Sequence, residues 1–231
     1  MTGWYISRIR LARSASVRAL APLILPPEDD RRTGAVHHWL WTLFTDGSER
    51  RRDFLWREET ARGERWRTSF ITLSARPPRD RHNLFNVETK PFEPVLAAGD
   101  RLRFKLTANP AVSQARVGSR GKRIDPVAAA LGLLGADERA ERRFEIIHVA
   151  GESWLAAQGR RSGFALDDGI SVDGDDWRVI PRANGKPITY SVLNFEGRLT
   201  VTDPAAFLVR LTSGFGKAKA FGCGLMLIRR G

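Results

Sequence analysis

The order of strand and helix patterns from residue 101 to residue 231 admits very few folds. Residues 101–108 alternate cleanly, with Leu102, Phe104 and Leu106 on one face, as in a half-buried strand. The patterns that follow are a polar and basic insertion, a helix, two strands, a second helix and a last strand, over residues 114–125, 152–164, 177–180, 188–201, 204–214 and 225–228. Apart from the insertion, this is the βαββαβ order of a ferredoxin-like domain, which RNA-recognition modules share.

The first half of the chain has a shortened version of this order. A strand is predicted at 4–11, a proline-rich loop at 12–33, and a helix from Val36. The apolar stripe of that helix is Val36, Trp39, Leu40, Leu43 and Phe44. Further strands are predicted at 53–57 and 65–73, with Gly63 at the turn between them, and a short fourth strand at 84–88.

These patterns predict an α+β protein of two tandem ferredoxin-like, RRM-like domains, the first with a reduced or missing second helix. Pro91, Pro94 and Gly99 mark a linker between them. The expected boundaries are therefore 1–91 for the N-terminal domain, 92–100 for the linker and 101–231 for the C-terminal domain.

Charge restricts the partners of this protein. The formal net charge is +12 at pH 7, which favours a polyanion such as a nucleic acid. No apolar run reaches the roughly 18 residues that a membrane-spanning helix needs, so no membrane contact is expected. The single cysteine excludes an internal disulfide framework and, without a signal-peptide core, favours a cytoplasmic location.

A glycine-lysine tail precedes the last strand. Lys217 and Lys219 lie among four glycines, Gly214, Gly216, Gly222 and Gly224. The tail does not match a P-loop, because Ala218 follows Lys217 where Ser or Thr is required. Two interpretations remain open: a backbone that approaches a phosphate closely, or a helix C-cap at Gly214 followed by a tight turn.

The sequence contains few residues suited to metal chemistry. It has four histidines, His37, His38, His82 and His148, and lacks zinc-ligand spacings such as C-x-x-C. The acidic residues between Asp167 and Asp176 do not match a calcium loop. We therefore expect neither a metal site nor a cofactor.

His37 is the best-placed residue for proton transfer. At about 100° per residue, His38 falls opposite the apolar stripe of its helix, whereas His37 falls at its flank, beside Trp41. One interpretation is a boundary histidine packed against Trp41. The other is catalysis on RNA, whose own 2′-hydroxyl is the nucleophile and needs only a group such as imidazole, with a pKa of about 6.5, to move its proton.

An ordered set of motifs extends over essentially the full chain. Its segments are 5–9 (YISRI), His37 with Trp41 and Phe44, 53–55 (DFL), 104–110 (FKLTANP), 195–201 (FEGxLTV) and 216–225 (GxAKxxGCGL). This set resembles the CRISPR-associated CasE endoribonucleases of type I-E systems. The resemblance implies two ferredoxin-like domains. It also implies cleavage of precursor CRISPR RNA at the base of the repeat hairpin, without metal, leaving a 2′,3′-cyclic phosphate and a 5′-hydroxyl.

The resemblance further implies that the enzyme keeps its product RNA and joins the other subunits of the Cascade complex. The catalytic histidine of the family lies four residues before the helix tryptophan, which makes it His37 here. Some members have a tyrosine three residues before that histidine, where this chain has Gly34. The second catalytic group is therefore open between Tyr5 and a nearby basic residue.

The basic insertion matches the hairpin with which the family grips the RNA stem. The residues expected to bind RNA are Arg116, Arg120, Lys122 and Arg123 of the insertion, Arg160 and Arg161 of the following helix, and Lys217 and Lys219 of the tail. A solvated charged loop is the alternative for each of them. Cys223 is expected to be a buried turn residue, and most tryptophans are expected in the core. If the tail binds RNA and His37 moves the proton, RNA lies across both halves.

Two other functions remain open. Gly34 in place of the tyrosine allows a catalytically inactive subunit of the same fold that only binds the CRISPR repeat. A scaffold that contacts only other protein subunits is disfavoured by the positive charge of the insertion and the tail.

Overall fold

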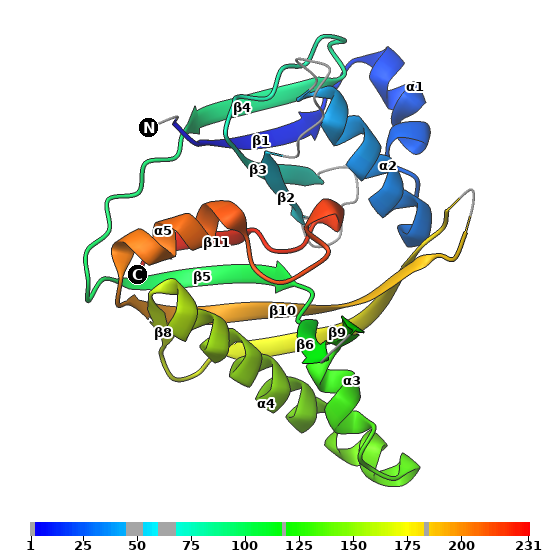
Figure 1. Ribbon diagram of the computed structural model, residues 1–231. Helices are drawn as coiled ribbons and strands as arrows, with labels where there is room; N and C mark the ends of the chain where they lie inside the picture. Colours follow the sequence, from blue (N-terminus) through cyan, green and yellow to red (C-terminus); the bar gives the residue numbers. More distant parts are fainter. Residues whose placement is uncertain (1–2, 45–52, 60–67, 117–118, 183–184) are drawn as a thin grey trace.

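The computed structural model describes residues 3–44, 53–59, 68–116, 119–182 and 185–231. Its main elements form two antiparallel sheets, one from each half of the chain (Figure 1). The first half contains β1 (Tyr5–Leu11), α1 (Ala15–Ile24), α2 (Asp29–Thr42), β2 (Phe54–Glu59), β3 (Ser69–Ser74) and β4 (Phe85–Pro91). The second half begins with β5 (Arg101–Ala108), β6 (Val112–Arg116), β7 (Ser119–Ile124), α3 (Pro126–Leu131) and α4 (Ala136–Ser162). It continues with β8 (Phe164–Leu166), β9 (Ser171–Ile180), β10 (Ile188–Val201), α5 (Pro204–Ser213), the short 3-10 helix η2 (Lys219–Phe221) and β11 (Met226–Arg230).

The first sheet has the strand order β2-β3-β1-β4, which is the ferredoxin-like order. Helix α2 packs on one face, where Val36 and Leu40 meet Ile9 and Phe70 in a buried cluster. Between β3 and β4, where every residue is described, the chain forms no helix. The expected absence of a second helix in this half is therefore confirmed for these residues.

The prediction of a loop over residues 12–33 was wrong. Helix α1 begins after Ser14, whose hydroxyl accepts a hydrogen bond from the Val17 amide at 3.3 Å, and α2 already begins at Asp29. Pro22 lies inside α1, where sequence reasoning treats proline as a breaker. Val17 and Ala21, one turn apart, are buried and hold the helix in place. The predicted turn at Gly63 lies outside the described residues.

The second sheet has the order β11-β5-β10-β8, and β9 also pairs with β10. Strands β8 and β9 pair with successive parts of β10, so together they occupy one strand position of a second ferredoxin-like half. Trp154 and Leu155 of α4 and Phe207 and Leu211 of α5 fill its core. The chain is thus an α+β protein with two tandem ferredoxin-like halves.

Helix α4 is much longer than predicted, because it begins at Ala136 instead of Glu152. Its first turns carry almost no buried apolar residues, so no stripe marks them in the sequence. Ion pairs support them: Arg142 lies 3.2 Å from Glu138 and 3.1 Å from Glu145. The basic insertion forms a separate two-stranded hairpin, β6–β7, which we call the basic hairpin.

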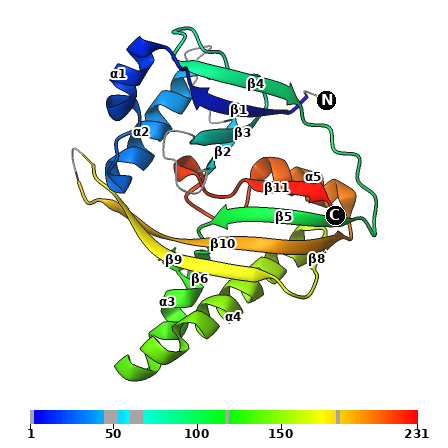
Figure 2. The same ribbon diagram turned by 180° about the vertical axis from the view of Figure 1, so that it is seen from behind.

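The two halves meet through the free face of the first sheet. Leu55, Ile71 and Leu73 form a buried cluster with Leu225, just before β11. The Trp56 indole donates a hydrogen bond to the Ala220 carbonyl at 3.0 Å. The glycine-lysine tail, residues 214–224, therefore lies between the halves, and Figure 2 shows it there from behind.

The glycines of the tail are required by this packing. Gly216 has φ of +68°, and a Cβ on it would clash with the carbonyl oxygen of Asn109. At Gly222, with φ of +82°, a Cβ would lie 3.1 Å from the Trp56 ring. Several tail amides donate within the protein, as Lys217 does to the Asn109 carbonyl at 3.1 Å. These glycines therefore let the tail approach other parts of the protein closely. Gly214 has a different role, because it is the C-cap that ends α5.

Gly216→Ala is expected to lower the free energy of unfolding by at least about 2 kcal/mol. The energetic cost of a positive φ in alanine adds to the cost of the clash with the backbone. Gly169→Ala is the matched control, since Gly169 has φ of +77° but no atom within 4 Å of an added Cβ. The control should lose only about 1 kcal/mol. Urea unfolding of the two variants measures both values, and equal losses would contradict the packing role of Gly216.

Candidate active site and RNA-binding surface

His37 lies on the flank of α2, as its helical position predicts. Val36 and Leu40 are fully buried, His38 is exposed and His37 is half-buried. The His37 ring lies edge-on to Trp41, with 6.2 Å between ring centroids. On another side it contacts Phe221, with 5.5 Å between centroids. Phe221 ends η2, so the structure brings the glycine-lysine tail directly against the helix that carries His37.

An aromatic chain continues from His37 into the second half. Phe221 stacks on Tyr190 of β10, with 5.7 Å between centroids and 22° between ring planes. Burial raises the pKa of Tyr190, so its phenol stays neutral at physiological pH. Helix α2 also contacts β9 directly. His37, Phe221 and Tyr190 therefore join the two halves at one place.

Two cavities adjoin Phe221. The first, which we call the tail cavity, has a volume of about 590 Å³ and is lined by Lys217–Phe221, Tyr190, Arg123, Trp177 and Arg182, among others. The second, about 260 Å³, is lined by Arg32, Arg57, Arg178, Asn194 and Gly222, among others. Both walls are rich in cations, which suits an anionic ligand beside His37.

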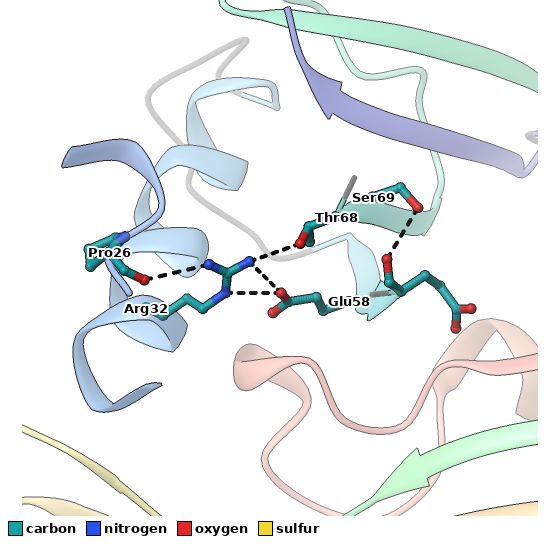
Figure 3. A network of polar contacts seen from close by, with 6 residues as sticks. Pro26, Arg32, Glu58, Thr68 and Ser69 are labelled. Carbon is teal, nitrogen blue, oxygen red and sulfur yellow. Dashed lines mark hydrogen bonds and ion pairs between the residues drawn. The ribbon is translucent and has the colours of Figure 1, made fainter. Parts of the chain in front are cut away.

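A polar network fixes the start of α2 on the first sheet (Figure 3). The Arg32 guanidinium donates two hydrogen bonds to Glu58, at 2.9 Å from Nε and 2.6 Å from Nη2. It also donates to the Thr68 hydroxyl at 3.2 Å and to the Pro26 carbonyl at 3.5 Å. Arg32 is thus a structural cation, which orients α2 and with it His37.

The model of the CRISPR associated protein family matches residues 4–230. This chain belongs to that family. It is 32% identical over 193 residues to the CRISPR-associated endoribonuclease Cse3 of Thermus thermophilus, covering 78% of this chain and 81% of Cse3. It is 27% identical over 223 residues to the Cascade subunit CasE of Escherichia coli, covering 96% and 97% of the two chains.

The fold agrees with this membership. A solved structure of Cse3 bound to a 19 nt RNA matches with a TM-score of 0.68 and 27% identity, over 98% of this chain and 99% of the other. A structure of Thermus thermophilus Cse3 with an RNA representing a pre-cleavage complex matches with a TM-score of 0.67. Within the family, the chain is a CasE-type endoribonuclease of type I-E systems.

The structure gathers some of the residues that we expected to bind RNA in this CasE protein. Arg123 of the basic hairpin lines the tail cavity together with Lys217 and Lys219. Lys122 is exposed on the same strand, and Lys219 donates to the Ser213 carbonyl at 2.6 Å. The backbones of Arg116 and Arg120 lie in β6 and β7, but their side chains are outside the described part.

Three expected residues lie elsewhere. Arg160 and Arg161 are in the last turn of α4, a helix that contacts β8, and neither residue lines the tail cavity. There Arg161 donates to the Ala157 carbonyl at 3.2 Å, a position that suits the negative end of a helix dipole. Tyr5 begins β1, between Ser74 and Pro91, and none of the described contacts of His37 reaches it.

Sequence reasoning missed Phe221, Tyr190, Trp177 and Arg182 as members of this site. Their partners come from the other half or from distant strands, so no local spacing marks them. Another cavity of about 1110 Å³, lined by Arg8, Arg10, Arg13 and Arg18, was also missed. It is larger but does not include the residues around His37, and Glu88 lies 3.4 Å from Arg10, so we do not place the chemistry there.

Neither His82 nor His148 lines the tail cavity. His82 is exposed, and His148 of α4 lies 2.9 Å from the Ile170 carbonyl through its Nε2. Among the described side chains, no three His, Cys, Asp or Glu residues are grouped as metal ligands. None of the described helices is both long and apolar enough to cross a membrane.

Cys223 is expected to resist alkylation in the folded protein. It is buried, as predicted, and burial raises the pKa of its thiol to about 12, so the reactive thiolate is scarce at pH 8. Iodoacetamide should therefore modify Cys223 in urea but not in native buffer, as measured by intact mass. Rapid modification of the native protein would contradict its burial.

Proposed function

We propose that this protein cleaves precursor CRISPR RNA at the base of the repeat hairpin, with His37 as the group that moves the proton. The observation that carries the proposal is the contact between His37 and Phe221, because it joins the candidate catalytic helix to a cation-lined tail cavity. A scaffold that contacts only proteins needs neither this histidine nor these cations.

The reaction needs no redox step. The 2′-oxygen of one nucleotide attacks the adjacent phosphorus, the bond from phosphorus to the 5′-oxygen breaks, and a 2′,3′-cyclic phosphate forms. The 2′-hydroxyl loses a proton and the leaving 5′-oxygen gains one. Neutral His37 accepts the first proton, or its protonated form supplies the second. Arg123 and Lys217 balance the added negative charge on the phosphate.

The second catalytic group remains a proposal. A side chain at Gly34 would point toward Ile180 of β9, because an added Cβ lies 4.0 Å from its Cγ2. Tyr5 and a basic residue of the inter-half surface stay as the candidates. We keep Arg178 as the basic alternative because it lines the cavity beside Phe221.

Product retention and assembly complete the proposal. The Escherichia coli relative is named a Cascade subunit, and that name supports the same assembly here. We propose that this protein stays on the mature crRNA and meets the other Cascade subunits in the cytoplasm, where precursor RNA is transcribed. Arg160 and Arg161, on the far end of α4, are then candidates for contacts with the distal part of the RNA stem.

The test incubates the purified protein with its repeat hairpin RNA in EDTA. The expected result is a single cut at the base of the hairpin, with a 2′,3′-cyclic phosphate on one product and a 5′-hydroxyl on the other. Tight binding without cleavage would favour the catalytically inactive subunit. Absence of both binding and cleavage would favour the protein scaffold.

A further inference from the structure

Trp177 is exposed in a way that the core does not explain. Trp177 lies on β9 and is 53% exposed to solvent, whereas Trp56 and Trp154 are only 2% and 5% exposed. The other described tryptophans are half-buried. Val179, two residues further along the same strand, is 44% exposed. Exposure of a single aromatic ring does not by itself mark a site, so the groups around Trp177 decide whether it binds a ligand.

Three cations line the same cavity as this ring. Trp177 lines the tail cavity with Arg123 from β7, Arg182 after β9 and Lys217 from the tail. In the described part of the chain, the charged groups of these three residues form no hydrogen bond or ion pair. They come from three separate segments, so the fold gathers them at one place.

Among the described residues that line this cavity, the only carboxylate is that of Asp125, and it is already hydrogen-bonded. One oxygen of Asp125 caps α3 by accepting from the Val127 and Ala128 amides, at 2.9 and 3.0 Å. Its other oxygen accepts a hydrogen bond from Ser191. The single negative charge of Asp125 does not balance the positive charges of Arg123, Arg182, Lys217 and Lys219 on the same wall, so the wall is net positive and attracts an anion.

An aromatic face beside free cations is the chemistry that binds a nucleotide. The base stacks on the ring while the cations hold its phosphates. Inside an A-form stem both faces of each base are covered, so Trp177 can stack only on an unpaired base or on the last pair of a stem. The cavity volume of about 590 Å³ lies within the usual range of ligand pockets.

The cavity is also next to the candidate catalytic group. Phe221 and Tyr190 form part of its wall, and Phe221 contacts His37. Resting on the proposed function, we propose that Trp177 stacks on the RNA base that flanks the scissile phosphate, with Arg123, Arg182 and Lys217 on the neighbouring phosphates. In this arrangement Trp177 marks the end of the paired RNA stem. It thereby determines which phosphodiester bond lies beside His37.

The test uses repeat RNA with a 2′-deoxy nucleotide at the cleavage site, which blocks the cut, and 2-aminopurine as the flanking base. Wild-type protein should quench the 2-aminopurine, and Trp177→Ala should abolish this quenching and weaken binding about 5- to 150-fold. Trp177→Phe should restore most of both. Phe144→Ala is the matched control, because Phe144 is 84% exposed on α4, away from the cavity.

A second RNA separates stacking from folding. A hairpin of the same length with abasic nucleotides in place of the flanking base and of the last base pair keeps the phosphates but offers no base at this position, so it should bind wild-type and Trp177→Ala protein equally. The inference is overturned if Trp177→Ala keeps the quenching and affinity of wild type, or if it loses the same affinity for both RNAs. Failure of wild-type protein to bind either RNA would instead overturn the proposed function itself.

Discussion

His37→Ala is expected to slow cleavage of the repeat hairpin by about 100- to 10,000-fold, the usual contribution of a general acid or base. RNA affinity should change little, because the cations that line the tail cavity remain. The physical reason is that alanine can neither accept the 2′-hydroxyl proton nor supply one to the leaving oxygen. Single-turnover cleavage rates and filter binding with the same RNA measure the two effects separately.

His38→Ala is the matched control for this variant. His38 is the next residue of the same helix, carries the same imidazole and is exposed, so its loss should leave cleavage nearly unchanged. Unchanged cleavage in His37→Ala, or an equal loss in His38→Ala, would refute the assignment. A 2′-deoxy nucleotide at the cleavage site should stop cleavage by wild-type protein, because it removes the nucleophile.

Phe221→Ala is expected to slow cleavage by about 100-fold, since small displacements of a catalytic group have effects of this size. Phe221 acts as a positioning residue, because its ring lies against His37 and stacks on Tyr190. The distances between ring centroids are 5.5 Å and 5.7 Å. Its loss leaves the His37 ring without one of its aromatic neighbours and separates the tail from α2. The single-turnover rate should fall far more than RNA affinity.

A conservative variant distinguishes positioning from general destabilisation. Phe221→Tyr keeps the ring and should restore most of the rate, whereas Phe221→Ala should also shift the pH profile of the single-turnover rate, because the surroundings of the His37 imidazole change. A rate loss that follows only the loss of thermal stability, with an unchanged pH profile in the remaining folded protein, would contradict a positioning role.

Elements with strong local patterns were predicted well. The alternation of β5 and the long run of β10 gave their ends correctly, and Asp203 with Pro204 marked the start of α5. The Asp203 carboxylate caps this helix, at 3.0 Å from the Ala205 and Ala206 amides. These signals are local, so the sequence alone contains them.

Elements without an apolar stripe were predicted poorly. The first turns of α4 are exposed and charged, and α1 contains a proline, so the usual helix signals are absent or reversed there. Their stability comes from ion pairs, a cap and packing in three dimensions. Such contributions depend on partners that periodicity cannot identify.

The sequence by itself determined the tandem ferredoxin-like order, the positive charge and the position of His37 on the flank of its helix, because periodicity and charge are local properties. Only the tertiary structure decided what lies beside His37. Phe221 contacts it from the other half and stacks on Tyr190, and Trp177 is exposed beside a cavity lined by cations from three segments. Contacts between residues far apart in the chain depend on how the two sheets pack, and no spacing in the sequence records that.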